Sequence, residues 1–164
     1  MKTAEDLSGK ASPREGDVRR LKSLTKQLDR DDIKLGMPLL DAAVAGLVLG
    51  FRPSDREMRR QADRCWEELK PHLAQHLSNE DEVLLPHIEH MERFTPEVIE
   101  RIKLSHRELH SLTRKLDGVS FEEDSDQSVG SAGKALVILA MKLDDTIDNE
   151  GLHMIPVLRR ELFA

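Results

Sequence analysis

The sequence predicts a single all-helical domain, folded as an up-down four-helix bundle. Leu, Glu, Arg, Lys and Ala dominate its 164 residues, whereas aromatic residues make up only 3% and Tyr is absent. Alternating runs rich in Val, Ile and Thr, which are typical of strands, are missing. Apolar residues instead recur at spacings of three and four, and two pairs of segments repeat along the chain. A helix pair used twice is typical of a bundle with pseudo-twofold symmetry.

The N-terminal part is expected to be a tail followed by a short helix. Residues 1–17 are polar and show no apolar period, which predicts a flexible tail. Val18, Leu21, Leu24 and Leu28 recur at helical spacing and predict an extra amphipathic helix that precedes the four helices of the bundle. The domain therefore spans residues 18–164. The basic residues of this first helix are Arg19, Arg20, Lys22 and Lys26.

Four further helices follow. Residues 37–51 are apolar nearly all round and predict the most buried helix. Ser54 and Glu57 form a capping box that starts a long helix towards His90. A third helix begins after Thr95 and ends before Gly118. Residues 119–133 are acidic and rich in Ser and Gly, which predicts a flexible loop before a last helix over residues 134–156.

Charge and cysteine content exclude several classes of function. The formal net charge is −6 and no basic stripe with interleaved aromatics occurs, so nucleic-acid binding is not expected. The single cysteine, Cys65, excludes an internal disulfide. The chain shows no apolar signal segment and no run long enough to span a bilayer, so no membrane association is expected, and we predict a cytoplasmic protein.

Histidines and carboxylates concentrate in residues 72–90, at helical spacing. His76 and Glu80 are four residues apart, so both project from one face of a helix and can bind the same metal ion. They also lie on the apolar stripe of that helix, which favours a metal site over a surface helix that merely carries histidines.

The repeats extend this pair to a site. HLSNEDEVLLP (residues 76–86) aligns without a gap with TIDNEGLHMIP (residues 146–156), which pairs Glu80 with Glu150 and His76 with Thr146. LLDAAVAGL (residues 39–47) aligns with LSHRELHSL (residues 104–112), which pairs Asp41 with His106. In a bundle these positions face a common interior point. Asp41 either has a partner or a metal there, or lies at the rim of its helix.

These segments resemble the hemerythrin-like (HHE cation-binding) domain family over about residues 37–162. The family carries one His on the first bundle helix, H-x-x-x-E on the second, one His on the third and H-x-x-x-E on the fourth. The resemblance implies a non-haem di-iron centre, with Glu80 and Glu150 as bridging carboxylates and His76 and His106 as terminal ligands. The family's first-helix His is Asp41 here, and its fourth-helix His is Thr146, which is a poor iron ligand. Asp41 offers a hard oxygen donor in its place.

Two kinds of site follow from these departures. In one, His76, Glu80, His106, Glu150 and Asp41 form a carboxylate-richer di-iron or mono-iron site, to which His72, His110 or His153 could add donors. Such a protein would bind or sense oxygen, nitric oxide or peroxide, or would decompose peroxide as an iron-dependent enzyme. No separate catalytic residue is assigned. In the other, the chain is a metal-free bundle that acts through protein contacts, with the basic N-terminal helix as the interacting element.

Overall fold

The computed structural model describes residues 15–163, except for the side chains of residues 15, 17, 28, 29 and 31–34. Every regular element within this part of the chain is helical. The α-helices are joined at two places by π-helical turns, labelled η. The elements in chain order are α1 (Glu15–Phe51), α2 (Arg56–Asn79), η1 (Glu80–Leu84), α3 (Leu85–Ile88), α4 (Pro96–Asp117), α5 (Asp126–Asn149), η2 (Glu150–Met154) and α6 (Ile155–Phe163).

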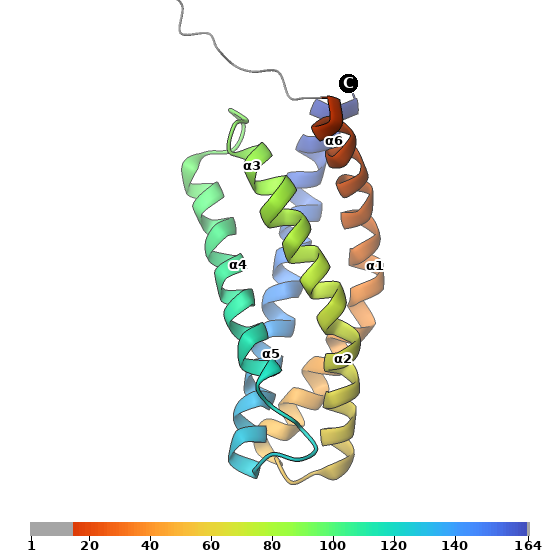
Figure 1. Ribbon diagram of the computed structural model, residues 1–164, viewed down its shortest axis with the longest axis vertical. Coiled ribbons are helices and arrows are strands. Elements are labelled where there is room, and N and C mark those ends of the chain that lie inside the picture. Colours follow the sequence, from red (N-terminus) through yellow and green to blue (C-terminus); the bar gives the residue numbers. More distant parts are fainter. Residues whose placement is uncertain (1–14, 164) are drawn as a thin grey trace, which may run out of the picture.

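Four helical rods stand side by side along the long axis of the molecule (Figure 1). The rods are α1, then α2 with η1 and α3, then α4, and finally α5 with η2 and α6. Consecutive rods run in opposite directions, and α1 packs against both α2 and α5 while α4 packs against α5. The all-α, up-down bundle predicted from the sequence is confirmed. Among the described helices, none combines the length and apolarity needed to cross a membrane.

The first rod is one continuous helix. α1 runs through Pro38, so the helix predicted over residues 18–28 and the apolar helix over residues 37–51 are two parts of it. A proline inside a helix costs about 3 kcal/mol, and the packing of α1 against its neighbours outweighs that penalty. Residues 15–17 of the predicted tail begin α1, and residues 1–14 of that tail lie outside the described residues.

The start of α1 packs against the C-terminal helix. Leu21 and Leu24 are buried, and the Lys22 ammonium lies 4.9 Å from the centre of the Phe163 ring in α6. At this distance a cation and an aromatic face attract each other. Of the basic residues that suggested an interacting element, Arg19, Arg20 and Lys26 are exposed.

Two helix starts differ from the sequence expectation. The cap of α2 is Asp55 rather than Ser54, and its carboxylate accepts hydrogen bonds from the backbone N–H groups of Glu57 and Met58. α5 begins after the Ser125 cap, so the connection to it is shorter than the predicted loop of residues 119–133. The small residues that suggested a loop lie inside α5, where they serve helix packing.

Glycines bring α1 and α5 into close approach. A Cβ atom at Gly133 would lie 2.7 Å from the carbonyl oxygen of Gly46, and one at Gly46 would lie 2.6 Å from the carbonyl oxygen of Gly133. Real Cβ atoms do not approach backbone oxygens this closely, so only glycine fits at both positions. This contact determines how close the first and fourth rods can come.

The core consists of two apolar clusters with a polar layer between them. The larger cluster includes Leu73 and Leu77 of α2 and Leu143 of α5. The smaller cluster lies towards the end of the bundle that carries both described chain ends, and its members are Leu21, Leu24, Leu84, Leu85, Ile88, Met154, Ile155 and Leu158. Along the second and fourth rods, the residues between the clusters include buried His76, Glu80 and Glu150. The bundle therefore encloses this polar layer between two apolar ones.

Replacing Gly133 should test the close approach. We expect Gly133→Ala to lower the free energy of unfolding by about 1–3 kcal/mol, because the obstructing atoms belong to the α1 backbone and cannot move aside alone. Gly36→Ala is the matched control, because Gly36 is exposed in α1 and nothing lies within 4 Å of its added Cβ. The control should raise the free energy of unfolding by about 0.5–1 kcal/mol through better helix propensity. Urea unfolding of both variants measures these changes, and a stabilising Gly133→Ala would contradict the packing role.

Candidate metal centre

The two π-turns begin at corresponding glutamates. Glu80 opens η1 and Glu150 opens η2, and each follows an asparagine, as the sequence repeat predicts. At the end of each turn a hydrogen bond spans five residues, from the backbone N–H of Leu85 to the Glu80 carbonyl and from that of Ile155 to the Glu150 carbonyl. Such turns occur most often at functional sites in helices. The local geometry of the two halves is therefore the same around both carboxylates.

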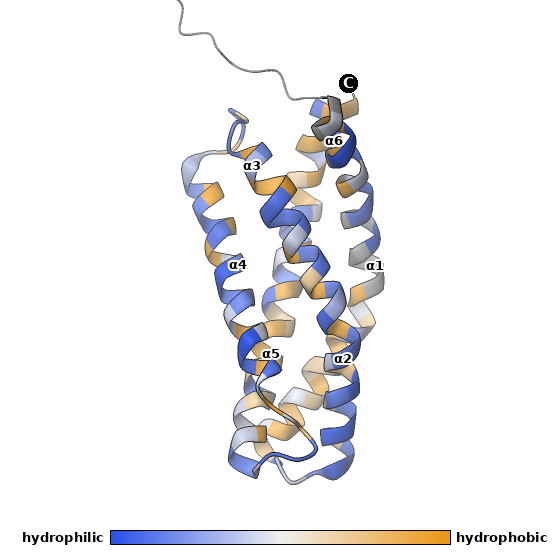
Figure 2. Cartoon of the chain, in the orientation of Figure 1, coloured by the Kyte–Doolittle hydropathy of each residue, from blue (hydrophilic) through white to orange (hydrophobic). Residues whose placement is uncertain are grey.

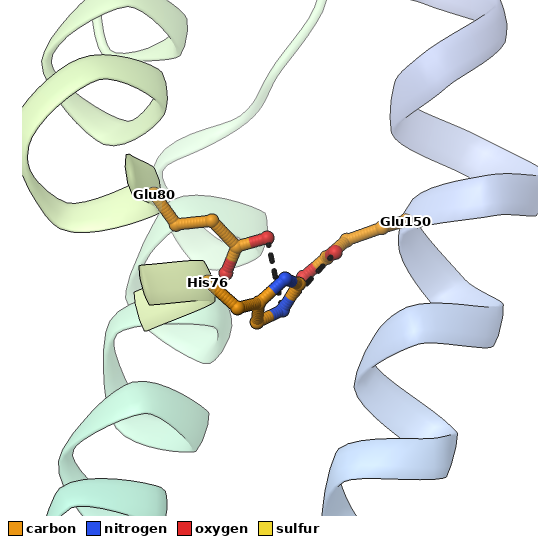
Figure 3. Close-up of side chains that lie close together, drawn as sticks. All are labelled: His76, Glu80 and Glu150. Carbon is orange, nitrogen blue, oxygen red and sulfur yellow. Dashed lines mark ion pairs between the residues drawn. The ribbon is translucent and has the colours of Figure 1, made fainter. Parts of the chain in front are cut away.

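Three buried side chains converge between the second and fourth rods (Figure 3). His76 Nε2 lies 3.3 Å from Glu80 Oε1 and 3.7 Å from Glu150 Oε2. One ligand atom from each residue lies within 4.8 Å of the others, and no side chain of the three is more than 5% exposed. An imidazole nitrogen and two carboxylate oxygens are donors that iron, zinc and manganese accept. These residues could hold a metal ion.

A second imidazole faces the same glutamate from α4. His106 is buried, and its Nε2 lies 2.7 Å from Glu80 Oε2. Within the described residues this nitrogen makes no hydrogen bond of acceptable geometry. Two ligand atoms at about 2.1 Å from one ion and at right angles to each other would lie about 3 Å apart. The two oxygens of Glu80 thus face two different histidines, which is an arrangement suited to a carboxylate shared by two metal positions.

Asp81 fixes the outer side of His106. Its Oδ1 lies 2.7 Å from His106 Nδ1, and its Oδ2 lies 2.8 Å from His110 Nε2. An ionised carboxylate only accepts hydrogen bonds, so each histidine nitrogen beside Asp81 is a donor. His106 therefore carries its proton on Nδ1, and its Nε2 lone pair points to the cluster as a possible metal ligand. Burial on its own would raise the pKa of Asp81, but the hydrogen bonds from His110 and His106 outweigh it and lower that pKa. Asp81 therefore stays ionised.

His76 is held in its neutral form. Burial is the main cause that lowers the pKa of His76 to about 4, and the electrostatic effect of the nearby His106 is the smaller one. A neutral imidazole offers a lone pair at pH 7, as metal binding requires.

The other predicted ligands do not reach this cluster. Asp41 has an exposed side chain on α1, so the structure corrects its expected position opposite His106. Asp41 was paired with His106 by aligning two helix segments, but at this point of the helical turn its side chain faces solvent. His72 and His153 are also exposed. His110 is half-exposed and bonds Asp81 instead.

Thr146 occupies the position where the repeat lacks a histidine. Its hydroxyl donates to the carbonyl oxygen of Lys142 and lies 3.0 Å from the hydroxyl of Ser105. Because its one proton goes to that carbonyl, Ser105 donates to Thr146. Both hydroxyls are therefore engaged with each other and with the helix, and the fourth rod contributes Glu150 without an imidazole beside it.

Sequence reasoning missed Asp81. Its signal was present, because His106 and His110 are four residues apart on one helix face and an acid directly follows Glu80. The orientation of α4 against η1, which brings both imidazoles to the Asp81 carboxylate, could not be predicted from the sequence.

A polar cavity of about 590 Å³ lies at the other end of the bundle, away from this cluster. Arg59 is one of its lining residues and donates to the carbonyl oxygens of Pro53 and Asp124 and to the carboxylate of Asp126. These bonds connect the α1–α2 turn to the start of α5. The polar groups that line the cavity thus include Arg59, which holds these two connecting segments together.

The family model described as the hemerythrin HHE cation-binding domain matches residues 19–158. The match starts within the first part of α1, earlier than the resemblance seen from residue 37. Neither the curated proteins nor the solved structures give a significant match to the chain. Because the matched segment covers most of the sequence and includes all four cluster residues, the chain belongs to the hemerythrin HHE cation-binding domain family.

Proposed function

We propose that this protein binds iron at the cluster of His76, Glu80, His106 and Glu150, and that it binds or senses a small ligand there. The observation that carries the proposal is Glu80, buried between two imidazoles with one oxygen towards each. Family membership supports iron as the metal. The mixture of imidazole and carboxylate donors fits a non-haem iron ion.

The two metal positions are unequal in this proposal. The first has three donors from the described residues, namely His76 Nε2, Glu80 Oε1 and Glu150 Oε2. The second has His106 Nε2 and Glu80 Oε2. Since affinity rises with the number of protein ligands, the first position fills first and the second binds more weakly. This assignment gives a mono-iron state at low iron and a di-iron state at high iron.

The donors fit a cation by charge as well. Glu80 and Glu150 are both buried beside a neutral His76, and holding two ionised carboxylates there carries a large desolvation cost. A bound divalent or trivalent cation would offset it. Such an anionic donor set favours iron(III) over iron(II).

The surroundings favour a small ligand. Bound iron supplies a Lewis acid and a redox-active centre with coordination positions left open. The cluster lies between two apolar layers of the core, so a small uncharged molecule such as oxygen, nitric oxide or hydrogen peroxide suits it better than a charged substrate. Gas evolution from added peroxide by the iron-loaded protein would distinguish decomposition of peroxide from reversible binding.

Replacing the shared carboxylate should remove the metal. We expect Glu80→Gln to lower the iron bound per chain at least about tenfold after reconstitution and desalting, because an amide keeps the size but loses the charge and one oxygen donor. Metal analysis and near-ultraviolet absorption measure the loss. Glu82→Gln is the control, since Glu82 lies exposed two residues later in η1 and bonds Ser78 at the surface. Equal iron in both variants would contradict the role of Glu80, and no iron in the unaltered protein would instead support a metal-free bundle.

Replacing Asp81 should weaken metal binding at the position that His106 and Glu80 provide. We expect Asp81→Ala to lower the iron(II) affinity of the weaker position about 10–100-fold, because His106 then loses the acceptor that sets its tautomer and ring orientation. Competition with a chelator measures the affinity, and the melting temperature of the metal-free protein checks the fold. His110→Ala is the control, since it leaves the Asp81–His106 bond in place. Asp81→Asn, which keeps one acceptor oxygen, should lose less affinity than Asp81→Ala; an unchanged affinity in Asp81→Ala would refute the role.

A further inference from the structure

An apolar stripe lies exposed along the second half of α1. Its side chains are between 47% and 82% exposed, although all are large and hydrophobic. They recur at spacings of three, four, three and four, which is the heptad pattern of a helix that packs against another helix. The members are Met37, Leu40, Val44, Leu47 and Phe51. Figure 2 shows that this half of α1, towards the α1–α2 turn, is coloured mostly as hydrophobic.

A second exposed stripe runs beside it on α5. A Cβ atom added at Gly46 would lie 3.1 Å from the Val137 side chain, and one added at Gly50 would lie 3.4 Å from that of Lys134, which gives the register of the two antiparallel helices. From Lys134 the exposed positions continue at spacings of four, three and four along the helix. They are Lys134, Ile138, Met141 and Asp145. Together the two stripes form one surface with an apolar centre, which we call the α1–α5 face.

We infer that the α1–α5 face binds a second copy of this chain, in an antiparallel twofold dimer centred near Val44. Exposed apolar surface with a regular heptad pattern is typical of an interface rather than of a solvated helix. A twofold axis across the helices pairs Val44 with its own copy and places Met37 against Phe51 of the other chain. Leu40 then meets Leu47 of the other chain, and the apolar side chains of α1 cover one another.

The charges on α5 fit this arrangement and no parallel one. Lys134 lies level with Gly50, about 9 Å along α1 from Val44, at 1.5 Å per residue. Asp145 is eleven residues further along the antiparallel α5, which places it about 8 Å beyond Val44 on the opposite side. A twofold axis through Val44 therefore brings Lys134 of one chain opposite Asp145 of the other, and does so twice. A parallel dimer would place like charges at the same level.

The same operation pairs the remaining apolar residues of α5. Ile138 and Met141 lie close to the level of Val44, on either side of it, so each meets the other across the axis. Leu104, on α4, is an exposed leucine outside the face and serves as a matched site for a control.

Sedimentation velocity of the full chain over a concentration series tests the dimer. We expect the unaltered protein to sediment as a dimer, and Leu47→Glu to raise the dimer Kd at least about tenfold with unchanged helical circular dichroism. Leu104→Glu introduces the same charge at a similarly exposed leucine and should leave the dimer intact. A monomer at all concentrations in the unaltered protein, or equal dissociation by both variants, would overturn the inference.

A charge reversal tests the antiparallel register without touching the apolar stripe. Lys134→Glu and Asp145→Lys should each weaken the dimer, since each places like charges opposite each other twice. The double variant restores opposite charges and should recover dimerisation to near the original Kd. Single variants that dimerise as well as the unaltered protein, or a double variant weaker than both, would overturn the antiparallel arrangement.

Discussion

The burial of two carboxylates and two imidazoles in one layer is the constraint on which the rest of this bundle depends. Removing such groups from water is expensive unless they are paired or bind a cation. His76, Glu80, His106 and Glu150 come from three of the four rods, so the rods must hold their spacing and phase for the groups to meet. The apolar clusters on both sides and the glycine contact between α1 and α5 provide that rigidity.

The unequal halves of the cluster follow from what surrounds each glutamate. Glu80 has His76 one turn before it and Asp81 directly after it, and Asp81 orients His106 from outside. Glu150 has Thr146 and Gly151 in the corresponding places, and the Thr146 hydroxyl is engaged by the helix and Ser105. The two halves thus have the same backbone conformation but different side chains. A repeated pair of helices therefore carries an asymmetric site.

Much of this arrangement could be predicted from the sequence, because the repeat carries both the helix phase and the carboxylates. Gapless alignments paired Glu80 with Glu150 and brought in His106 through its match with Asp41. Helix boundaries were less predictable. Pro38 and the glycines of α5 resemble breaks locally, but the packing of α1 against α5 overrides them. Asp41 could not be excluded from spacing alone, because a small shift in helix phase decides whether a carboxylate faces the core or water.

The π-turns have a consequence for the single-residue deletions that the second and fourth rods can accept. A π-turn accommodates one residue more than the α-helix that would replace it, and one residue corresponds to about 100° of rotation. A deletion that converts η1 to plain α-helix would therefore keep Leu85 and Ile88 facing their apolar cluster, whereas a deletion inside α2 would rotate everything after it by about 100°. For the apolar cluster that follows, a single-residue deletion is accordingly less disruptive in either turn than in the α-helical parts of the same rods. The extra residue in each half thus matters to the backbone at Glu80 and Glu150, where the turns begin, and not to the core beyond them.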